Sequence, residues 1–212
     1  MEAPAARGWL RETGERIFHR IVENPAVFYY ARTHFYWGTM GRLRRALDLR
    51  PGERLLDIGC GSGMGAGLTR GMYVGIDTEM TYLRFAHARL RDSSRHSFLA
   101  MSAVELGFRD GAFDKAMLLN VVHHLDDAMV DRFLGHVTRV VRQRIFILDH
   151  DPERDNAVSG WLVKHDRGAH MRKCADLAAL LERHCRVETI DRFYNAEHTV
   201  ACALFTLAPR RA

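Results

Sequence analysis

The chain has 212 residues, of which 47% are hydrophobic and 27% charged, so it can bury a core without disulfides and is too apolar to be disordered throughout. No apolar run approaches the roughly 18 residues that a membrane-spanning helix needs, and the charged N-terminus lacks the apolar stretch of a signal peptide. Four cysteines without CxxC spacing indicate reduced thiols, not a disulfide framework or a zinc site. These features together favour a cytoplasmic protein.

The net charge of +5 is concentrated in residues 1–50, which hold nine arginines against five acidic residues. A basic segment of this kind can bind nucleic acid, an anionic membrane surface or an acidic substrate, but it can equally be the solvated face of a helix. Residues 51–212 are almost neutral, so the basic surface is too narrow to follow a nucleic-acid groove. We therefore expect no specific nucleic-acid binding.

The first 50 residues have the pattern of two helices. Apolar residues recur at helical spacing over 5–22, and Asn24-Pro25 ends that segment, because proline suits the first turn of a new helix. The second helix is expected over about 25–48 and contains a cluster of aromatic residues with His34. Such a cluster can line a pocket, although aromatic residues at helical spacing more often form core.

From Arg54 onward, short apolar runs alternate with helical patterns. The runs cover 54–58, 72–76, 97–101, 113–119 and 144–148, and the helical patterns cover 79–91, 127–141 and 175–184. This alternation predicts a doubly wound α/β fold, with a parallel sheet covered by helices on both faces. The last two runs, 186–193 and 198–207, predict an antiparallel pair at one edge, and the long 150–173 connection indicates a functional segment.

The segment LLDIGCGSGMG (55–65) predicts a strand that runs directly into a glycine loop, followed by a helix. Glycines let a ligand lie against the bare backbone, and such a loop lies at the carboxyl edge of a parallel sheet. Asp77 ends the next strand, where a carboxylate can accept both hydroxyl hydrogens of a ribose. Asp57 precedes the loop, where its charge suits an ammonium group and disfavours a pyrophosphate. The pattern therefore favours S-adenosylmethionine over NAD.

LLDIGCGSG, then GID, then AMSAVELGFRDGAFDKAMLLNVVHHLDD together resemble the class I S-adenosylmethionine-dependent methyltransferases, in particular the small-molecule branch that includes quinone-biosynthesis enzymes. The resemblance covers about residues 53–150. It implies a Rossmann-like seven-stranded sheet with one antiparallel strand near the C-terminus. On this interpretation residues 51–212 are the methyltransferase domain, and residues 1–50 are N-terminal helices that form a lid over the site.

The resemblance also implies a cofactor site. Asp57 and the loop glycines would hold the methionine end, Asp77 the ribose, and Thr78 with the Ser102–Val104 segment the adenine, while the tip of the fourth strand passes the sulfonium. The predicted cofactor-binding residues are Asp57, Gly59, Gly61, Gly63, Asp77, Thr78, Ser102, Ala103, Val104, Asn120 and Val121. Ser102 stands where the family often has an aspartate.

Substrate chemistry is inferred from position. His123 and His150 follow the fourth and fifth strands, beside the expected methyl donor, and a neutral histidine can accept a proton from a hydroxyl or an acidic carbon. Either histidine can instead be purely structural. The candidate substrate contacts are Tyr30, His34, Asp149 and Trp161. The set Asp149, His150, Asp151, His165, Asp166 and His170 does not have the spacing of a ligand pair on one helix face, so we expect no metal.

The sequence thus predicts a methyltransferase that uses S-adenosylmethionine and acts on a small molecule, with O- or C-methylation favoured. Two alternatives remain open at this stage. One is an RNA-directed methyltransferase, which the basic N-terminus favours, although the Asn/Asp-Pro-Pro-aromatic motif of base-amine methylation is absent. The other is a non-catalytic subunit that binds the cofactor. The oligomeric state is not indicated.

Overall fold

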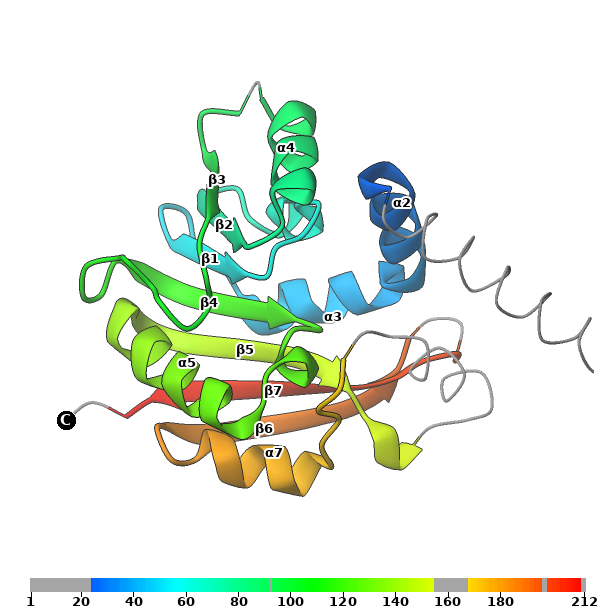
Figure 1. Ribbon diagram of the computed structural model, residues 1–212, viewed down its shortest axis with the longest axis vertical. Helices are drawn as coiled ribbons and strands as arrows, with labels where there is room; N and C mark the ends of the chain where they lie inside the picture. Colours follow the sequence, from blue (N-terminus) through cyan, green and yellow to red (C-terminus); the bar gives the residue numbers. More distant parts are fainter. Residues whose placement is uncertain (1–23, 92, 155–167, 196–197, 211–212) are drawn as a thin grey trace, which may run out of the picture.

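The computed structural model describes residues 24–91, 93–154, 168–195 and 198–210, and its centre is one seven-stranded sheet. The strands stand in the order β3-β2-β1-β4-β5-β7-β6 (Figure 1). Their bounds are β1 Arg54–Ile58, β2 Met72–Asp77, β3 His96–Ala100, β4 Phe113–Leu119, β5 Val141–His150, β6 Cys185–Tyr194 and β7 Ala201–Pro209.

Strands β1 to β5 are parallel, whereas β7 is antiparallel to both of its neighbours, β5 and β6. The doubly wound fold with an antiparallel strand near the C-terminus is therefore confirmed. Because the first five strands run in one direction, their carboxyl ends meet at a single edge of the sheet. The predicted site residues Asp77, Asn120 and Asp149 lie at or next to these strand ends.

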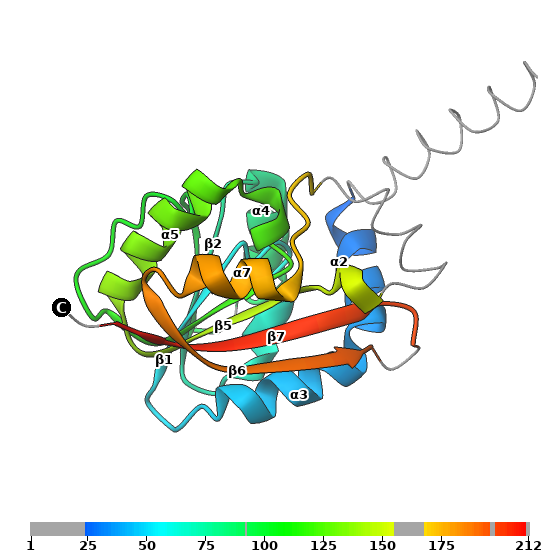
Figure 2. The same ribbon diagram turned by 90° about the horizontal axis from the view of Figure 1, so that it is seen from below.

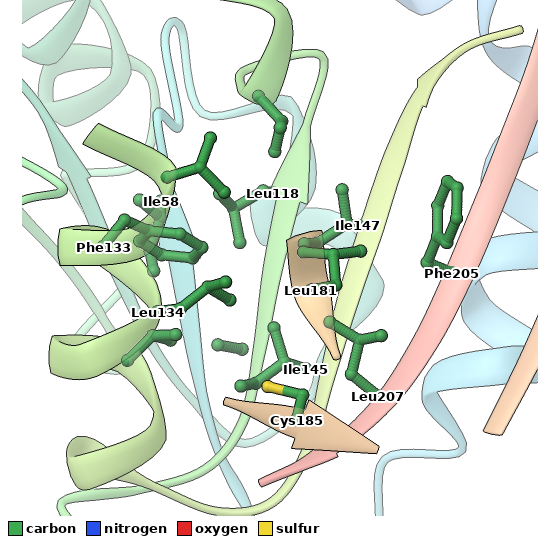
Figure 3. Packing of buried hydrophobic residues seen from close by; sticks show 14 of the residues in the cluster. Ile58, Leu118, Phe133, Leu134, Ile145, Ile147, Leu181, Cys185, Phe205 and Leu207 are labelled. Atoms are coloured by element: carbon green, nitrogen blue, oxygen red, sulfur yellow. The ribbon is translucent and has the colours of Figure 1, made fainter. Parts of the chain in front are cut away.

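Helices α5 (Asp127–Val140) and α7 (Cys174–Leu181) cover one face of the sheet (Figures 1 and 2). Asp126 caps the start of α5, because its side chain accepts a hydrogen bond of 2.7 Å from the Met129 N–H. Its apolar stripe packs against strand residues such as Ile58, Leu118 and Ile145 (Figure 3).

The opposite face is covered by α3 (Trp37–Leu47), which buries Leu43 and Leu47 in a second core cluster (Figure 2). The preceding α2 (Pro25–Phe35) begins after Asn24, whose side chain accepts from the Ala26 N–H at 3.0 Å. The expectation of one helix over 25–48 was wrong, because the chain breaks at Tyr36. The break separates α2, which lies beyond the carboxyl ends of the strands, from α3, which packs on the sheet (Figure 1).

The connection between β1 and β2 differs from the regular α/β pattern. The expected helix after the glycine loop is only a 3-10 turn, η1 (Met64–Leu68), because its sequence MGAGL is short and glycine costs a helix about 1 kcal/mol per residue. Helix α4 (Met80–Arg89) follows β2 as predicted, and the short turns η2 (Val122–His124) and η3 (Pro152–Arg154) follow β4 and β5. No helix within the described ranges is long and apolar enough to cross a membrane. The 5–22 helix and Trp161 lie outside the described residues.

Candidate functional site

The carboxyl edge of the sheet brings together most of the residues that the sequence singled out. Asp57 is the second-to-last residue of β1, and Asp77 is the last residue of β2. Asn120 follows β4, and Asp149 lies near the end of β5. The hydrogen-bonded pairing of β2 with β3 continues to the last residue of each strand, where Asp77 stands opposite Ala100. The parallel register, and not local sequence, therefore collects these side chains.

The glycine loop is shaped by backbone conformation. Gly59, Gly61 and Gly63 have φ angles of 70°, 50° and 75°, in the left-handed region that side chains rarely tolerate. A Cβ atom at Gly59 would also overlap the side chain of Val121, which thus packs directly on the loop. The loop is anchored to β2, because the Gly59 and Cys60 N–H groups both donate to the Ile76 carbonyl, at 2.8 and 3.0 Å.

Asp77 joins the loop to the strand after it. Its Oδ2 accepts from the Gly61 N–H at 2.7 Å, and its Oδ1 accepts from the Glu79 N–H at 2.9 Å. Each carboxylate oxygen can accept two hydrogen bonds, so this arrangement leaves capacity for the two hydroxyls of a ribose. The carboxylate is half-buried, and Thr78 beside it is exposed at the mouth of this edge.

Asp57 is buried and holds a partner that sequence reasoning missed. The hydroxyl of the fully buried Tyr73, the second residue of β2, donates to Asp57 Oδ2 at 2.5 Å. Burial, followed by the Asp57 charge, raises the Tyr73 pKa well above its usual value, so the hydroxyl remains a donor. Period-2 alternation would have placed Tyr73 on a buried face, but only the register Leu55↔Tyr73 brings it beneath the carboxylate.

Cys60, at the centre of the loop, is not a nucleophile in this setting. Burial raises the pKa of its thiol far above the ordinary range, and the charges of Asp57 and Asp77 add to the effect. The thiol packs closely on Gly75 of β2, where a Cβ atom would approach the sulfur to 2.8 Å. Cys60 therefore acts as a small apolar residue that seats the loop on β2.

After β3, the chain turns sharply across the same edge. The Met101 N–H donates to the Asp77 carbonyl at 3.0 Å, and the Val104 N–H lies 3.3 Å from Ser102 Oγ. Ser102, Ala103 and Val104, which follow Met101, are all half-buried, and their role on the adenine side of the site stays a prediction. Ser102 uses its hydroxyl to stabilise this turn.

Asn120 has the left-handed backbone conformation, with φ of 55°, immediately after β4. Its side-chain Nδ2 donates to the Tyr36 hydroxyl at 2.7 Å, and both residues are buried. Its Oδ1 is buried without a hydrogen-bond partner among the described residues. Tyr36 was not among the predicted site residues, because 84 positions separate it from Asn120.

His123 and Asp149 form a buried pair at the ends of β4 and β5. Nδ1 of His123 lies 2.5 Å from Asp149 Oδ1, and the His123 backbone N–H donates to Asp149 Oδ2 at 3.0 Å. His150 is half-buried, and the centroid of its ring lies 5.3 Å from the centroid of the His123 ring. The His150 backbone N–H donates to Asp149 Oδ1. A cavity of about 10 Å³, room for about one water, adjoins both histidines.

The chain segment 168–173 covers this pair. The His170 N–H donates to the His123 carbonyl at 3.0 Å, and a Cβ atom at Gly168 would overlap the His123 ring. Arg172 fixes the segment by donating to the Leu125 carbonyl at 2.7 Å. The end of the long 150–173 connection thus lies over the β4 and β5 tips, where the sequence predicted a functional segment.

Two of the predicted substrate contacts lie on α2. Tyr30 is 70% exposed and packs edge-on against Tyr29, and His34 is also exposed. Tyr29 ties α2 to α4, since Arg89 lies over its ring at 4.2 Å. Their role as substrate contacts stays a prediction, as does that of Asp149, which the structure shows engaged with His123.

The described residues contain one group with ligand atoms close enough for a metal: Asp151, Glu153 and Cys174. Arg192 already occupies it, with Nε at 2.7 Å and Nη2 at 2.8 Å from the two oxygens of the buried Asp151. The arginine therefore compensates the carboxylates. Of the residues weighed earlier as metal ligands, His165 and Asp166 lie outside the described residues.

The residues at the loop fit S-adenosylmethionine. Carboxylates flank the loop on both sides, and these favour an ammonium group and ribose hydroxyls while they oppose a pyrophosphate. Asp57 would hold the methionine ammonium, and Asp77 the ribose. The nearby Arg89 is not directed to a phosphate position, since its guanidinium donates to the Gly63 carbonyl at 2.8 Å.

Comparisons with known proteins agree with this geometry. Residues 56–147 match the family model of a methyltransferase domain. The 2-phytyl-1,4-naphthoquinone methyltransferase of Synechocystis is 29% identical over 157 residues, which cover 67% of this chain and 64% of that protein. The chain thus spans slightly less than two thirds of this relative's length.

Two solved structures share the fold. One, a protein solved in complex with the Haloferax volcanii Trm112 methyltransferase activator, has a TM-score of 0.76 at 16% identity over 91% of this chain and 98% of that chain. The other, an S-adenosylmethionine-dependent methyltransferase from Aquifex aeolicus, has a TM-score of 0.67 at 16% identity over 84% and 93%. S-Adenosylmethionine is the cofactor that this family implies. The chain thus carries a methyltransferase domain at residues 56–147, within a sheet that has the fold of the S-adenosylmethionine-dependent methyltransferase from Aquifex aeolicus.

Proposed function

We propose that this protein transfers a methyl group from S-adenosylmethionine to a small-molecule acceptor. The observation that carries the proposal is the glycine loop held between Asp57 and Asp77, with Asn120 and the His123–Asp149 pair at the adjoining strand ends. The acidic flanks account for cofactor choice, and the polar groups beyond Asn120 account for a reaction with a polar acceptor.

When bound, S-adenosylmethionine supplies an electrophilic methyl group on a sulfonium. The protein's part is to align the acceptor with that methyl group and to exclude water. Asp57 and the backbone of Gly59, Gly61 and Gly63 hold the methionine end, and Asp77 binds the ribose. Thr78 and the Ser102–Val104 turn border the adenine, and Asn120 with Val121 borders the reacting group.

The acceptor binds between the tips of β4 and β5 and the 150–173 connection. A histidine, His123 or His150, takes the proton if the acceptor is a hydroxyl or an acidic carbon, and this favours O- or C-methylation. The Synechocystis relative, named for a naphthoquinone, supports a small aromatic or quinone-like acceptor. Trp161, in the same connection, is a further candidate contact.

The N-terminal residues 1–50 form the lid of this site. Supporting observations are the bond between Tyr36 and Asn120 and the packing of Tyr29 on Arg89 of α4, both at the edge where the cofactor would lie. Tyr30 and His34, exposed on α2, would then contact the acceptor. The α3 part of this region also packs on the sheet, so α2 is the described part of the lid that would cover the site.

An RNA-directed methyltransferase is the second candidate function. The basic charge of residues 1–50 favours it, and the fold shared with the protein bound to the Trm112 activator raises the possibility of a small activator subunit. The near-neutral charge of residues 51–212 argues against it. A non-catalytic subunit that binds the cofactor is the third.

The experiment is to incubate purified protein with S-adenosylmethionine labelled in the methyl group and with two acceptor pools, one of small phenols and quinols and one of transfer and ribosomal RNA. We expect label only in the small-molecule pool. Labelling of RNA that persists at about 200 mM salt would overturn the proposal and favour an RNA-directed methyltransferase. Tight cofactor binding without label in either pool, with or without an added Trm112 protein, would favour the non-catalytic subunit.

A further inference from the structure

The hydrogen bonds around Asp149 determine which nitrogen of His123 carries a proton. Oδ2 accepts from the His123 backbone N–H at 3.0 Å, and Oδ1 accepts from the His150 backbone N–H at 2.8 Å. Backbone amides can only donate, so both oxygens accept a main-chain hydrogen bond, an arrangement that favours the carboxylate form. Opposite a carboxylate, His123 Nδ1, 2.5 Å from Oδ1, is the N–H donor.

This assignment fixes the chemistry of the other ring nitrogen. A neutral imidazole carries one proton, so a ring with Nδ1–H has Nε2 as its acceptor atom. The His123 N–H bond to Asp149 and the His170 N–H bond to the His123 carbonyl hold the His123 backbone in place, and the contact between Nδ1 and Asp149 Oδ1 orients the ring. Asp149 thus holds His123 in the form that can receive a proton at Nε2.

His123 lies at the carboxyl edge of the sheet, where the methyl donor is expected. His123 is 2% exposed and follows Asn120 by three residues, and its ring adjoins the small cavity shared with His150. The titratable and charged groups that face it are Asp149 and His150 from β5, His124 from η2, and His170 and Arg172 from the covering segment. Asp149 is the group that can stabilise an imidazolium at this position.

We propose that His123 Nε2 is the proton acceptor of the methyl transfer, that Asp149 is its positioning residue, and that the acceptor class is a phenol-like or enol-like hydroxyl. The inference rests on the proposed function. The acceptor oxygen–methyl carbon bond forms as the methyl carbon–sulfur bond breaks and its electron pair stays on sulfur. The hydroxyl proton passes to Nε2, and the resulting imidazolium, paired with Asp149, later loses a proton to water.

His150 differs from His123 in the way that matters here. Asp149 receives only the backbone N–H of His150, so it does not orient the His150 ring. His150 therefore contributes to the acceptor pocket and not to proton transfer.

The first arm of the test needs no cofactor. Long-range ¹H–¹⁵N correlation spectra of histidine-labelled protein should show neutral His123 with its proton on Nδ1. In Asp149→Asn, one of the two oxygens becomes an NH2 group, which donates and cannot accept. Whichever position the NH2 takes, it faces a backbone N–H of His123 or His150. We therefore expect the ring to change to the Nε2–H form or to exchange between the two forms. A wild-type ring protonated on Nε2 would overturn the proposal, and this result is independent of whether the variant folds.

The second arm measures turnover with a matched pair of acceptors, 2-naphthol and 2-naphthalenethiol, of which only the thiol is largely ionised at neutral pH. His123→Gln and Asp149→Asn should each lower naphthol turnover about 100-fold, with loss of the acidic limb of the pH profile, and change thiol turnover less than about threefold. His150→Gln should keep the naphthol pH profile, and exposed His124→Gln should behave as wild type.

Equal losses on naphthol and thiol in His123→Gln would mean a structural role and would overturn the proposal, as would loss of the acidic limb in His150→Gln instead. A protein that methylates the thiol and not the naphthol would overturn the substrate class. Absence of S-adenosylmethionine binding would defeat the proposed function alone, since the tautomer of His123 is measured without the cofactor.

Discussion

Removal of the Tyr73 hydroxyl tests whether Asp57 is held for an ammonium group or is merely buried. Tyr73→Phe keeps the ring that packs against Phe98, at 5.7 Å between centroids, and deletes only the 2.5 Å hydrogen bond to the carboxylate. A hydrogen bond to a charged group contributes about 1.5–3 kcal/mol. At about 2–4 °C per kcal/mol for a chain of this size, the melting temperature of the ligand-free protein should fall by about 3–12 °C.

The sharper expectation concerns the cofactor. With its internal donor removed, Asp57 gains more from a ligand ammonium, so saturating S-adenosylmethionine should raise the melting temperature of the variant by more than it raises that of wild type. Thermal melts with and without cofactor measure both quantities, and exposed Tyr30→Phe, at 70% exposure, is the matched control with almost no change expected. A drop below about 1 °C, or an equal ligand effect in both proteins, would refute the role given to Asp57.

Other predictions follow from the described contacts. Gly59→Ala, at φ of 70° and against Val121, should weaken S-adenosylmethionine binding by at least about tenfold in calorimetry, and Val121→Ala added to it should restore only part of the loss, because the φ strain remains. Lys115→Met should lower the free energy of unfolding by about 3 kcal/mol in urea melts, because buried Lys115 is 2.9 Å from the shielded Glu53 carboxylate; Arg142→Met, at a half-exposed pair, should cost less than about 1 kcal/mol. Burial raises the pKa of the Cys185 and Cys202 thiols to about 12, from an ordinary 9.0, so the folded state keeps these protons while unfolded thiols lose theirs. The contribution of these thiols to the free energy of unfolding is therefore full below about pH 9 and falls above it by about 1.4 kcal/mol per pH unit per thiol. In urea melts between about pH 8 and pH 10, the free energy of unfolding of Cys202→Ala should depend less on pH than that of wild type.

The sequence was sufficient to locate the strands and the loop, because both rest on local chemistry. Glycines at 59, 61 and 63 indicated backbone that other residues avoid, and the structure gives each a positive φ. Apolar runs bounded by polar residues indicated buried parallel strands. The sequence failed where a helix was expected after the loop, since a helix of ordinary length cannot form over MGAGL before β2 begins at Met72.

The contacts that give the site its chemistry are non-local, so pattern alone could not reveal them. The partner of Asp149, His123, lies 26 positions earlier in the chain and is found only through the β4–β5 register. Tyr36 reaches Asn120 across 84 positions, because the chain breaks between α2 and α3. Both contacts depend on how whole helices and strands pack together, and this packing results from the burial of many residues at once.

The most direct test of the central claim is the binding of S-adenosylmethionine, measured by titration calorimetry on the wild-type chain and on Asp77→Ala. The matched control is Asp191→Ala, an exposed carboxylate paired with Arg42 on the far strand β6. We expect wild type and Asp191→Ala to bind S-adenosylmethionine equally and not to bind NAD. Asp77→Ala, if folded by its melting curve, should bind about 10- to 150-fold more weakly, the equivalent of about 1.5–3 kcal/mol for hydrogen bonds to a charged group. Measurable NAD binding without S-adenosylmethionine binding, or an Asp77→Ala variant that binds as tightly as the control, would contradict the account.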